Sequence, residues 1–190
     1  MWNIRTVRQL EKSNAEIENQ KEQLKRLSYH DTLTTMYNRN KYMDTLDGYR
    51  RHRLKNVGVL YIDLNGLKYI NDSQSHEAGD RYICDAAVAI LQAFSGSSYR
   101  IGGDEFTVVI NSPGNDLCEQ LVKRFKQEQE LFNRNAKHYE LGVRIAVGYA
   151  VNNATDRDYA DVFNRADRQM YLDKQEIKKT ARATDYVDNR

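Results

Sequence analysis

The hydrophobic and polar positions of the chain follow two spacings, one helical and one alternating, which predicts a mixture of helices and strands. A near-continuous apolar run over residues 57–62 is typical of a buried strand, and residues 141–151 alternate like a second one. Apolar residues recur at helical spacing in four stretches, about residues 40–53, 75–94, 116–134 and 159–178. With a hairpin expected around residues 99–110, the order is helix, strand, helix, hairpin, helix, strand, helix. It predicts an α/β fold, an α+β sandwich with a central, mostly antiparallel sheet flanked by helices.

The same spacing predicts the inward faces of the helices. The predicted core positions are Tyr42, Met43, Leu46, Tyr49, Ile83, Ala87, Ile90, Leu91, Phe94, Leu117, Leu121, Val122, Phe125 and Leu131. The last residues, 180–190, are charged and are expected to be loose, with Tyr186 and Val187 as a candidate edge strand.

The first 28 residues are highly charged and contain neither glycine nor proline. Four apolar residues fit the a and d positions of a heptad, namely Val7, Leu10, Ile17 and Leu24. This pattern predicts a weak coiled coil, in which Asn14 at a further a position would fix the register of two strands. The alternatives are a solvated single helix or an expression remnant.

Composition narrows the class of protein. Hydrophobic residues make up 40% and charged residues 29%, as expected for a globular domain with a modest core. A net charge of +2 is too small for a protein that binds polymeric nucleic acid. Cys84 and Cys118 lack the spacing of a metal site and are interpreted as reduced thiols in the cytosol. The apolar run at 57–62 is too short to span a bilayer, and no signal peptide is recognisable.

The most unusual stretch is Gly102-Gly103-Asp104-Glu105-Phe106, at the turn of the predicted hairpin. Glycines allow the positive backbone φ angles that a tight turn needs, whereas two adjacent acids are uncommon beside a strand. Alternation along the strand predicts that one carboxylate faces a ligand and the other does not. A carboxylate beside glycine backbone suits a hard cation that carries phosphates. The alternative is a surface turn with solvated acids.

A further acid, Asp63, ends the buried strand and is followed by Gly66 and Lys68. This arrangement is common in metal and phosphate sites, although a strand-end aspartate can instead cap the next helix. Asp63 and Asp104 would form a two-carboxylate metal site if their strands are neighbours.

Three motifs together resemble the GGDEF domains, the diguanylate cyclases of bacteria. The first is the pentapeptide at residues 102–106. The second, Asp-Thr-Leu-Thr-Thr-Met-Tyr-Asn-Arg at 31–39, is similar to the family's Asp-x-Leu-Thr-Gly-Leu-x-Asn-Arg, with Thr35 and Met36 replacing glycine and leucine. The third, at 166–174, is similar to the closing motif Ala-Asp-x-Ala-Leu-Tyr-x-Ala-Lys. The resemblance spans about residues 29–178 and implies a fold of the nucleotide-cyclase and polymerase-palm type.

The resemblance implies a metal site and a catalytic pair. By this likeness Asp63, Asp104 and the backbone carbonyl of Leu64 hold the metal, which is Mg²⁺ or Mn²⁺. Asp104 and Glu105 are the implied catalytic residues, since either carboxylate could assist deprotonation of the attacking hydroxyl.

The resemblance also implies how substrate is bound. Asn71 and Asp80 match the positions that hydrogen-bond guanine, so GTP is favoured over ATP. The other implied substrate contacts are His76, Lys68, Lys174 and Lys178, and the two C-terminal lysines would meet the triphosphate. Lys178 stands where arginine is common, and a lysine offers a point charge rather than a bidentate fork.

The implied activity is the condensation of two GTP molecules into cyclic di-GMP and two pyrophosphates. Because each domain has one GTP pocket, two copies must face each other as a homodimer, which the N-terminal helix would bring together. The expected parts are a signalling helix at 1–28, a catalytic domain at 29–180 and a tail at 181–190. The upstream sensor is expected to lie outside this chain, and the expected compartment is the cytoplasm, including the cytoplasmic side of a membrane sensor.

One feature of many family members is missing. Their Arg-x-x-Asp ahead of the hairpin forms an inhibitory product site, and here Ala93 and Gly96 occupy those positions. Inhibition by product through that site is therefore not expected, with Arg100 a conceivable substitute. Two other functions stay open, a GTP-binding regulatory domain without catalysis and a coiled-coil interaction module with an inert passenger domain.

Overall fold

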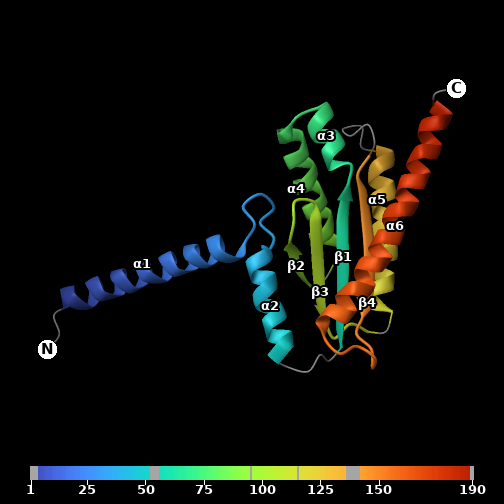
Figure 1. Ribbon diagram of the computed structural model, residues 1–190. Helices are drawn as coiled ribbons and strands as arrows, with labels where there is room; N and C mark the ends of the chain where they lie inside the picture. Colours follow the sequence, from blue (N-terminus) through green and yellow to red (C-terminus); the bar gives the residue numbers. More distant parts are fainter. Residues whose placement is uncertain (1–3, 52–55, 95, 115, 136–141, 189–190) are drawn as a thin grey trace.

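A four-stranded antiparallel sheet in the order β2-β3-β1-β4 forms the centre of the computed structural model, which describes residues 4–51, 56–94, 96–114, 116–135 and 142–188 (Figure 1). The strands are β1 (Val57–Asn65), β2 (Ser97–Arg100), β3 (Glu105–Asn111) and β4 (Arg144–Val151). The helices are α1 (Ile4–Tyr29), α2 (Arg39–Arg51), α3 (Leu67–Ser73), α4 (His76–Ala93), α5 (Leu117–Asn135) and α6 (Tyr159–Asp188). The predicted sandwich of helices on an antiparallel sheet is confirmed.

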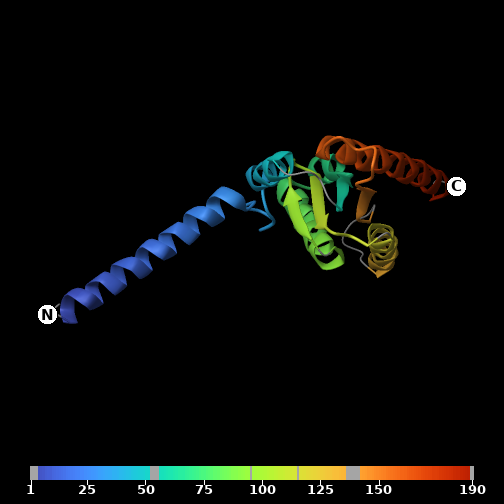
Figure 2. The same cartoon turned by 90° about the horizontal axis from the view of Figure 1, so that it is seen from below.

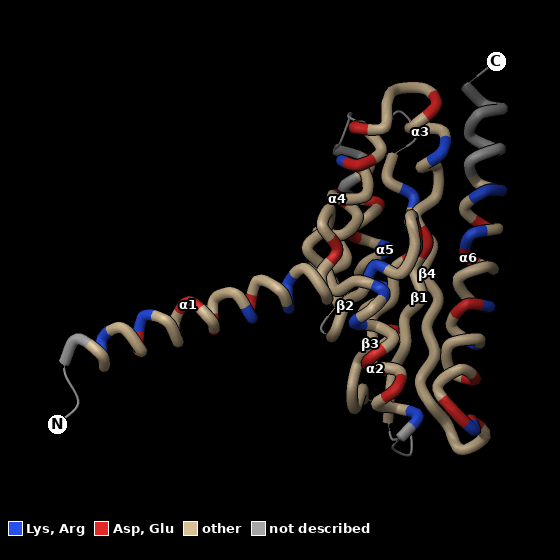
Figure 3. Tube along the Cα trace, turned by 60° about the vertical axis from the view of Figure 1, so that its left-hand side comes forward, with Lys and Arg blue, Asp and Glu red and all other residues tan. Residues whose placement is uncertain are grey.

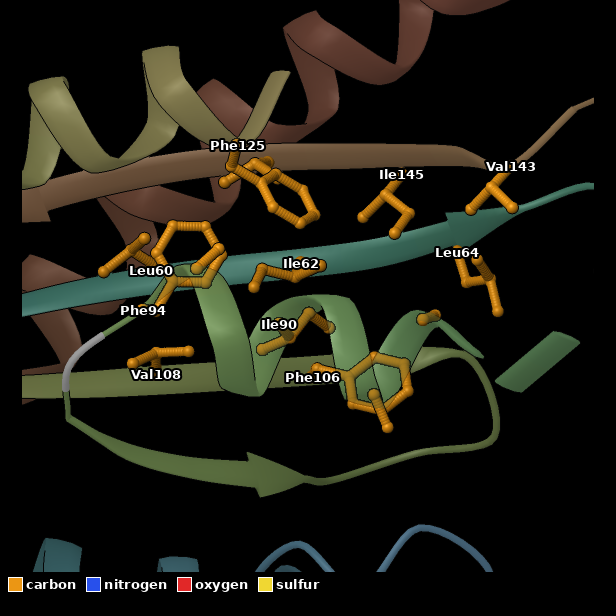
Figure 4. Packing of buried hydrophobic residues seen from close by; sticks show 14 of the residues in the cluster. Leu60, Ile62, Leu64, Ile90, Phe94, Phe106, Val108, Phe125, Val143 and Ile145 are labelled. Carbon is orange, nitrogen blue, oxygen red and sulfur yellow. The ribbon is translucent and has the colours of Figure 1, made fainter. Parts of the chain in front are cut away.

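Helices cover both faces of the sheet. Viewed from below, α2 and α6 lie on one side and α4 and α5 on the other (Figure 2). The core between the sheet and α4 and α5 contains Leu60, Ile62, Leu64, Ile90, Phe94, Phe106, Val108, Phe125, Val143 and Ile145 (Figure 4). The opposite core is rich in tyrosines, with Tyr42, Tyr61, Tyr99 and Tyr159 packed on Val59 and Ala146.

The central position of β1 explains its unbroken apolar sequence. It pairs with β3 on one side and β4 on the other, and all but the last of its residues are buried. A strand that is covered on both faces needs apolar side chains at every position rather than at alternate ones. The register places Asp63 directly opposite Glu105, so the end of β1 meets the turn that precedes β3.

Several sequence predictions at the helices are wrong. Met43, Leu91 and Leu131 are 42%, 48% and 55% exposed, because each helix buries a narrower stripe than its apolar residues suggest. Residues 67–73 form the helix α3, which follows Gly66 in the left-handed conformation at φ 87° and which the pattern did not indicate. The candidate edge strand at Tyr186 and Val187 is also wrong, since α6 continues to Asp188.

Helix α1 extends away from the sheet domain (Figures 1 and 2). Acidic and basic residues are interspersed along it (Figure 3). Its heptad residues are exposed to between 41% and 66%, as in Val7 and Leu24, so this apolar stripe has no cover within the described chain. Among the helices in that part of the chain, none has the length and apolar composition that a membrane span requires.

Candidate functional site

Two acids from distant parts of the sequence meet where β1 ends. The turn between β2 and β3 is closed by the N–H groups of Ile101 and Gly102, which donate to the Glu105 carbonyl at 2.9 and 3.3 Å. One residue earlier, the Asp104 carbonyl accepts from the N–H of Leu64 at 2.9 Å. These bonds fix the turn beside Asp63, so the predicted neighbourhood of the two strands is confirmed.

A lysine from the last helix completes this cluster. The Nζ of Lys174 lies 2.7 Å from the Asp63 carboxylate oxygens and donates a hydrogen bond to Oδ2. The side chains are 9% exposed for Asp63 and 27% for Lys174, so the pair is shielded from bulk water. Oδ1 of Asp63 is buried and faces the same ammonium, as an ion pair without the angles of a hydrogen bond.

Gly148 in β4 explains how α6 comes close enough to supply this lysine. A Cβ atom at Gly148 would lie 2.1 Å from the carbonyl oxygen of Ala166 and 2.1 Å from the backbone nitrogen of Met170. The helix backbone therefore packs directly on the strand, which only glycine allows. Lys174 follows Met170 by about one helical turn and is carried to the end of β1. Basic residues recur along this helix beside the sheet (Figure 3).

Glu105 is held by a tyrosine that sequence reasoning missed. The hydroxyl of Tyr61 donates to Oε1 of Glu105 at 2.6 Å. The Tyr61 ring is buried and meets the ring of Phe163 edge-on at 4.8 Å. Burial, and then the neighbouring Glu105, raise the pKa of Tyr61, so its hydroxyl remains a donor. The unbroken apolar pattern of β1 gave no sign of this role, because any large apolar residue would fit the same place.

Asp104 lies partly buried beside other negative charge. Burial raises the pKa of Asp104 above its ordinary value, the nearby Asp63 carboxylate raises it further, and Lys174 acts in the opposite direction. Converging, partly desolvated carboxylates favour a bound cation, because each one lacks compensation from water.

The carboxylates of Asp63 and Asp104 suit a hard divalent metal ion that takes its remaining ligands from the substrate. Asp63 presents a nearly buried carboxylate that already attracts the Lys174 ammonium, and carboxylate oxygens are the protein ligands that Mg²⁺ prefers. In the described part of the chain, no group of three or more His, Cys, Asp or Glu side chains is arranged to hold a metal ion. Magnesium commonly binds through one or two carboxylates plus substrate phosphates, so this arrangement suits a metal that arrives with a nucleotide.

Arg100 ties the turn to the start of the domain. Its Nη2 donates to the Gly103 carbonyl at 2.8 Å, and its Nη1 donates to both carboxylate oxygens of Asp31 at 3.1 and 3.2 Å. Burial acts to raise the pKa of Asp31, but hydrogen bonds from Thr34 and then Arg100 outweigh it and lower that pKa. Because its guanidinium is committed to these two partners, Arg100 is poorly placed to replace an inhibitory arginine.

The residues assigned to guanine lie on α3 and α4. Asn71 is half-buried near the end of α3, and its side-chain oxygen packs on Gly79, where a Cβ atom would lie only 1.9 Å away. Asp80 is the next residue and is exposed. Helix α4 begins here because the Ser75 hydroxyl caps it by accepting from the N–H of Ala78 at 3.2 Å. The Asn71 side chain thus packs on the residue that precedes Asp80 in α4.

The structure does not join the other predicted substrate residues to the acids. Lys68, His76 and Lys178 are exposed. Across the described residues, no hydrogen bond or ion pair links them to the carboxylates of Asp63 or Asp104. Their assignment therefore still depends on the sequence resemblance.

Comparison with known proteins gives a consistent family. The family model described as "Diguanylate cyclase, GGDEF domain" matches residues 28–180. The cyclic di-GMP phosphodiesterase PdeR of Escherichia coli K12 is 31% identical over 157 residues, which are 81% of this chain and 24% of that protein. A diguanylate cyclase of Vibrio cholerae serotype O1 is 31% identical over 163 residues, 81% of this chain and 49% of that protein. The chain spans half or less of the length of these relatives.

Solved structures show the same fold. The coiled coil and GGDEF domain of DgcB from Caulobacter crescentus, in complex with c-di-GMP, superposes with a TM-score of 0.73. The match covers 90% of this chain and 95% of that one, at 22% sequence identity. The FimX GGDEF domain from Pseudomonas aeruginosa gives a TM-score of 0.67 at 18% identity, over 78% of this chain and 95% of that one. At these identities the likeness concerns the fold alone.

Proposed function

On the premise that the chain belongs to the GGDEF family, the diguanylate cyclase domains, we propose that it condenses two GTP molecules into cyclic di-GMP and two pyrophosphates. The observation that carries this proposal is the meeting of Asp63, Asp104 and Lys174 at the end of β1. Two carboxylates with a cation at one sheet edge can bind a metal and phosphates together.

The metal would be Mg²⁺ or Mn²⁺, held by Asp63, Asp104 and the Leu64 carbonyl, with phosphate oxygens completing the set. When bound, it would neutralise charge on the triphosphate and make pyrophosphate a better leaving group. The chain's own part is to hold the backbone of the two acids side by side, which the Leu64 N–H does by donating to the backbone carbonyl of Asp104.

Substrate recognition is assigned to residues around this edge. Asn71 and Asp80 would hydrogen-bond the guanine edge, with the amide donating or accepting and the carboxylate accepting from the base N–H groups. The lysines and the histidine assigned to the rest of the substrate are Lys68, His76, Lys174 and Lys178. Lys174 is the best supported of these, because it already lies at the acids.

The reaction forms a bond between the 3′-hydroxyl oxygen of one GTP and the α-phosphorus of the other, and it breaks the bond to pyrophosphate. Asp104 or Glu105 would accept the hydroxyl proton. In the metal-free chain, burial raises the pKa of Asp104 above its ordinary value. The Tyr61 hydroxyl orients Glu105 in the same region.

The product contains two identical bonds, so the working unit would be a homodimer in which two sites face each other. Residues 1–28 would pair as a coiled coil, consistent with the exposed heptad residues of α1. Residues 29–180 would then be the catalytic domain and 181–190 the tail. The free cysteines Cys84 and Cys118 suit the reducing cytoplasm. The input signal would come from a sensor outside this chain.

The competing proposal is a GTP-binding regulatory domain that does not turn over. It is favoured by the likeness to a phosphodiesterase, whose matched region is a small part of that protein. The deciding experiment is incubation of the purified chain with GTP and Mg²⁺, with mass-spectrometric identification of the product. Cyclic di-GMP should form, and Asp104→Asn should form none while keeping its circular-dichroism spectrum and melting temperature. GTP binding without product would support the regulatory alternative.

A further inference from the structure

We propose that Lys174 acts as the resident cation of the acidic site, and that a divalent metal displaces it efficiently only together with GTP. This inference rests on the proposed function, because it concerns how metal and nucleotide share the Asp63 carboxylate. It assigns Lys174 a second role, as a competitor of the metal in the nucleotide-free protein.

The geometry places the lysine where a metal would bind. Nζ of Lys174 is 2.7 Å from the Asp63 carboxylate, the contact distance of a charge-assisted hydrogen bond. Asp63 is nearly buried, so few other cations can reach it without moving the lysine. Lys174 is not drawn to the adjacent Asp173, because that carboxylate pairs with Lys126 and accepts from the Val147 N–H at 2.8 Å.

The competition follows from charge. An ammonium group and a divalent ion cannot occupy the same side of one carboxylate, since like charges repel strongly at such distances in a partly buried site. Without nucleotide, the metal would have to expel Lys174 and would gain only the protein ligands assigned to it, the carboxylates of Asp63 and Asp104 and the Leu64 carbonyl. The expelled ammonium would lose its ion pair with Asp63.

A bound triphosphate favours both the binding of the metal and the release of Lys174 from Asp63. Its oxygens supply further ligands to the metal, and they also offer the released ammonium an anionic partner. Lys174 can then move from Asp63 to phosphate as the metal enters. The binding of metal and nucleotide should therefore be coupled through this one side chain, and such coupling is reciprocal by thermodynamic linkage.

The distinguishing consequence is an effect of opposite sign on the two ligands. Replacing Lys174 with glutamine should strengthen Mn²⁺ binding to the nucleotide-free protein, because the competitor is gone. The same change should weaken nucleotide binding, because a phosphate partner is gone. A merely structural role for Lys174 would weaken both.

The test measures free Mn²⁺ by electron paramagnetic resonance during titration of the nucleotide-free chain. Lys174→Gln should bind Mn²⁺ at least about five-fold more tightly than the parent chain, the lower end of typical coupling between sites. It should bind a GTP analogue with a methylene bridge between the α- and β-phosphates more weakly. Lys178→Gln, which removes the same charge one turn further along α6, should leave nucleotide-free Mn²⁺ affinity unchanged. Lys174→Arg, which keeps the charge, should stay near the parent.

A double variant tests whether the effect of Lys174 on Mn²⁺ affinity acts through the Asp63 carboxylate. In an Asp63→Asn background, Lys174→Gln should no longer change Mn²⁺ affinity, because the shared carboxylate is gone. Unchanged or weaker Mn²⁺ binding by folded Lys174→Gln would overturn the inference. If that variant does not fold, the Mn²⁺ affinity of the parent chain is compared with and without the GTP analogue. Equal affinities would also overturn the inference. Absence of Mn²⁺ binding even with the analogue would instead refute the metal site of the proposed function.

Discussion

Replacing Gly79 with alanine should weaken GTP binding by about 5- to 150-fold while leaving the fold nearly unchanged. Gly79 lies buried in the first turns of α4, and its Cα supports the side chain of Asn71 from α3. A Cβ atom here would lie 1.9 Å from the Asn71 side-chain oxygen and 2.9 Å from its Cγ. Real Cβ contacts essentially never fall below 3.0 Å, so the amide must withdraw by roughly an ångström.

The predicted magnitude follows from what that movement removes. If Asn71 hydrogen-bonds guanine, a shift of this size breaks the bond and leaves a polar group unpaired, at a cost of about 1–3 kcal/mol. Each 1.4 kcal/mol is tenfold in affinity, which gives the stated range. Folding should change by less than about 1 kcal/mol, because alanine gains close to that amount in a helix and the clash is with a movable side chain.

The assay compares the affinity for a non-reactive GTP analogue with the melting temperature. Gly48→Ala is the matched control, because Gly48 is also helical and a Cβ atom there meets nothing within 4 Å. It should leave GTP affinity unchanged and raise the melting temperature by about 2–4 °C. In an Asn71→Ala background, Gly79→Ala should have no further effect on affinity, because the clash is already removed.

Two results would refute this reasoning. Unchanged GTP affinity in folded Gly79→Ala would mean that Asn71 does not read the base. An equal loss in the presence and absence of the Asn71 side chain would mean that the added methyl group acts by another route.

Three further predictions concern the acids and the product. Asp80→Ser should lower the preference for GTP over ATP by about 1–3 kcal/mol with little effect on folding. Competition kinetics with mixed nucleotides measure this preference, and an unchanged value would contradict the assignment of Asp80. Tyr61→Phe keeps the buried ring but removes the donor to Glu105, so it should lower kcat more than it raises KM. Additive losses in a double-mutant cycle with Glu105→Gln would argue against a role for the Tyr61–Glu105 hydrogen bond. Cyclic di-GMP should not inhibit noncompetitively through the upstream site of the family, because Ala93 offers no charge or donor and Gly96 has no side chain. Titration of product at saturating GTP tests this, and inhibition that GTP does not relieve would reveal another regulatory site.

Local sequence signals were sufficient for most secondary structure. The unbroken apolar run of β1 and the two glycines before Asp104 predicted a central strand and a hairpin, because strand burial and turn geometry depend on adjacent residues. Helix α4 was predicted from its own periodicity, whereas its cap at Ser75 became visible only in the structure. Local patterns failed where burial depends on neighbours, so Leu91 was placed in the core although the partners of α4 cover only part of its apolar stripe.

The acids of the candidate site were identifiable from sequence as unusual residues at strand ends, but their partners were not. Lys174 and Asp63 are separated by 111 residues, and they meet only because Gly148 lets α6 pack against β4. Tyr61 reaches Glu105 because the register of β1 and β3 places Asp63 opposite Glu105. Register and helix packing arise from the fit of whole surfaces, and hydrophobic periodicity specifies which face is buried without specifying what it meets. Only the tertiary structure therefore determined that Lys174 is the partner of Asp63 and Tyr61 the partner of Glu105.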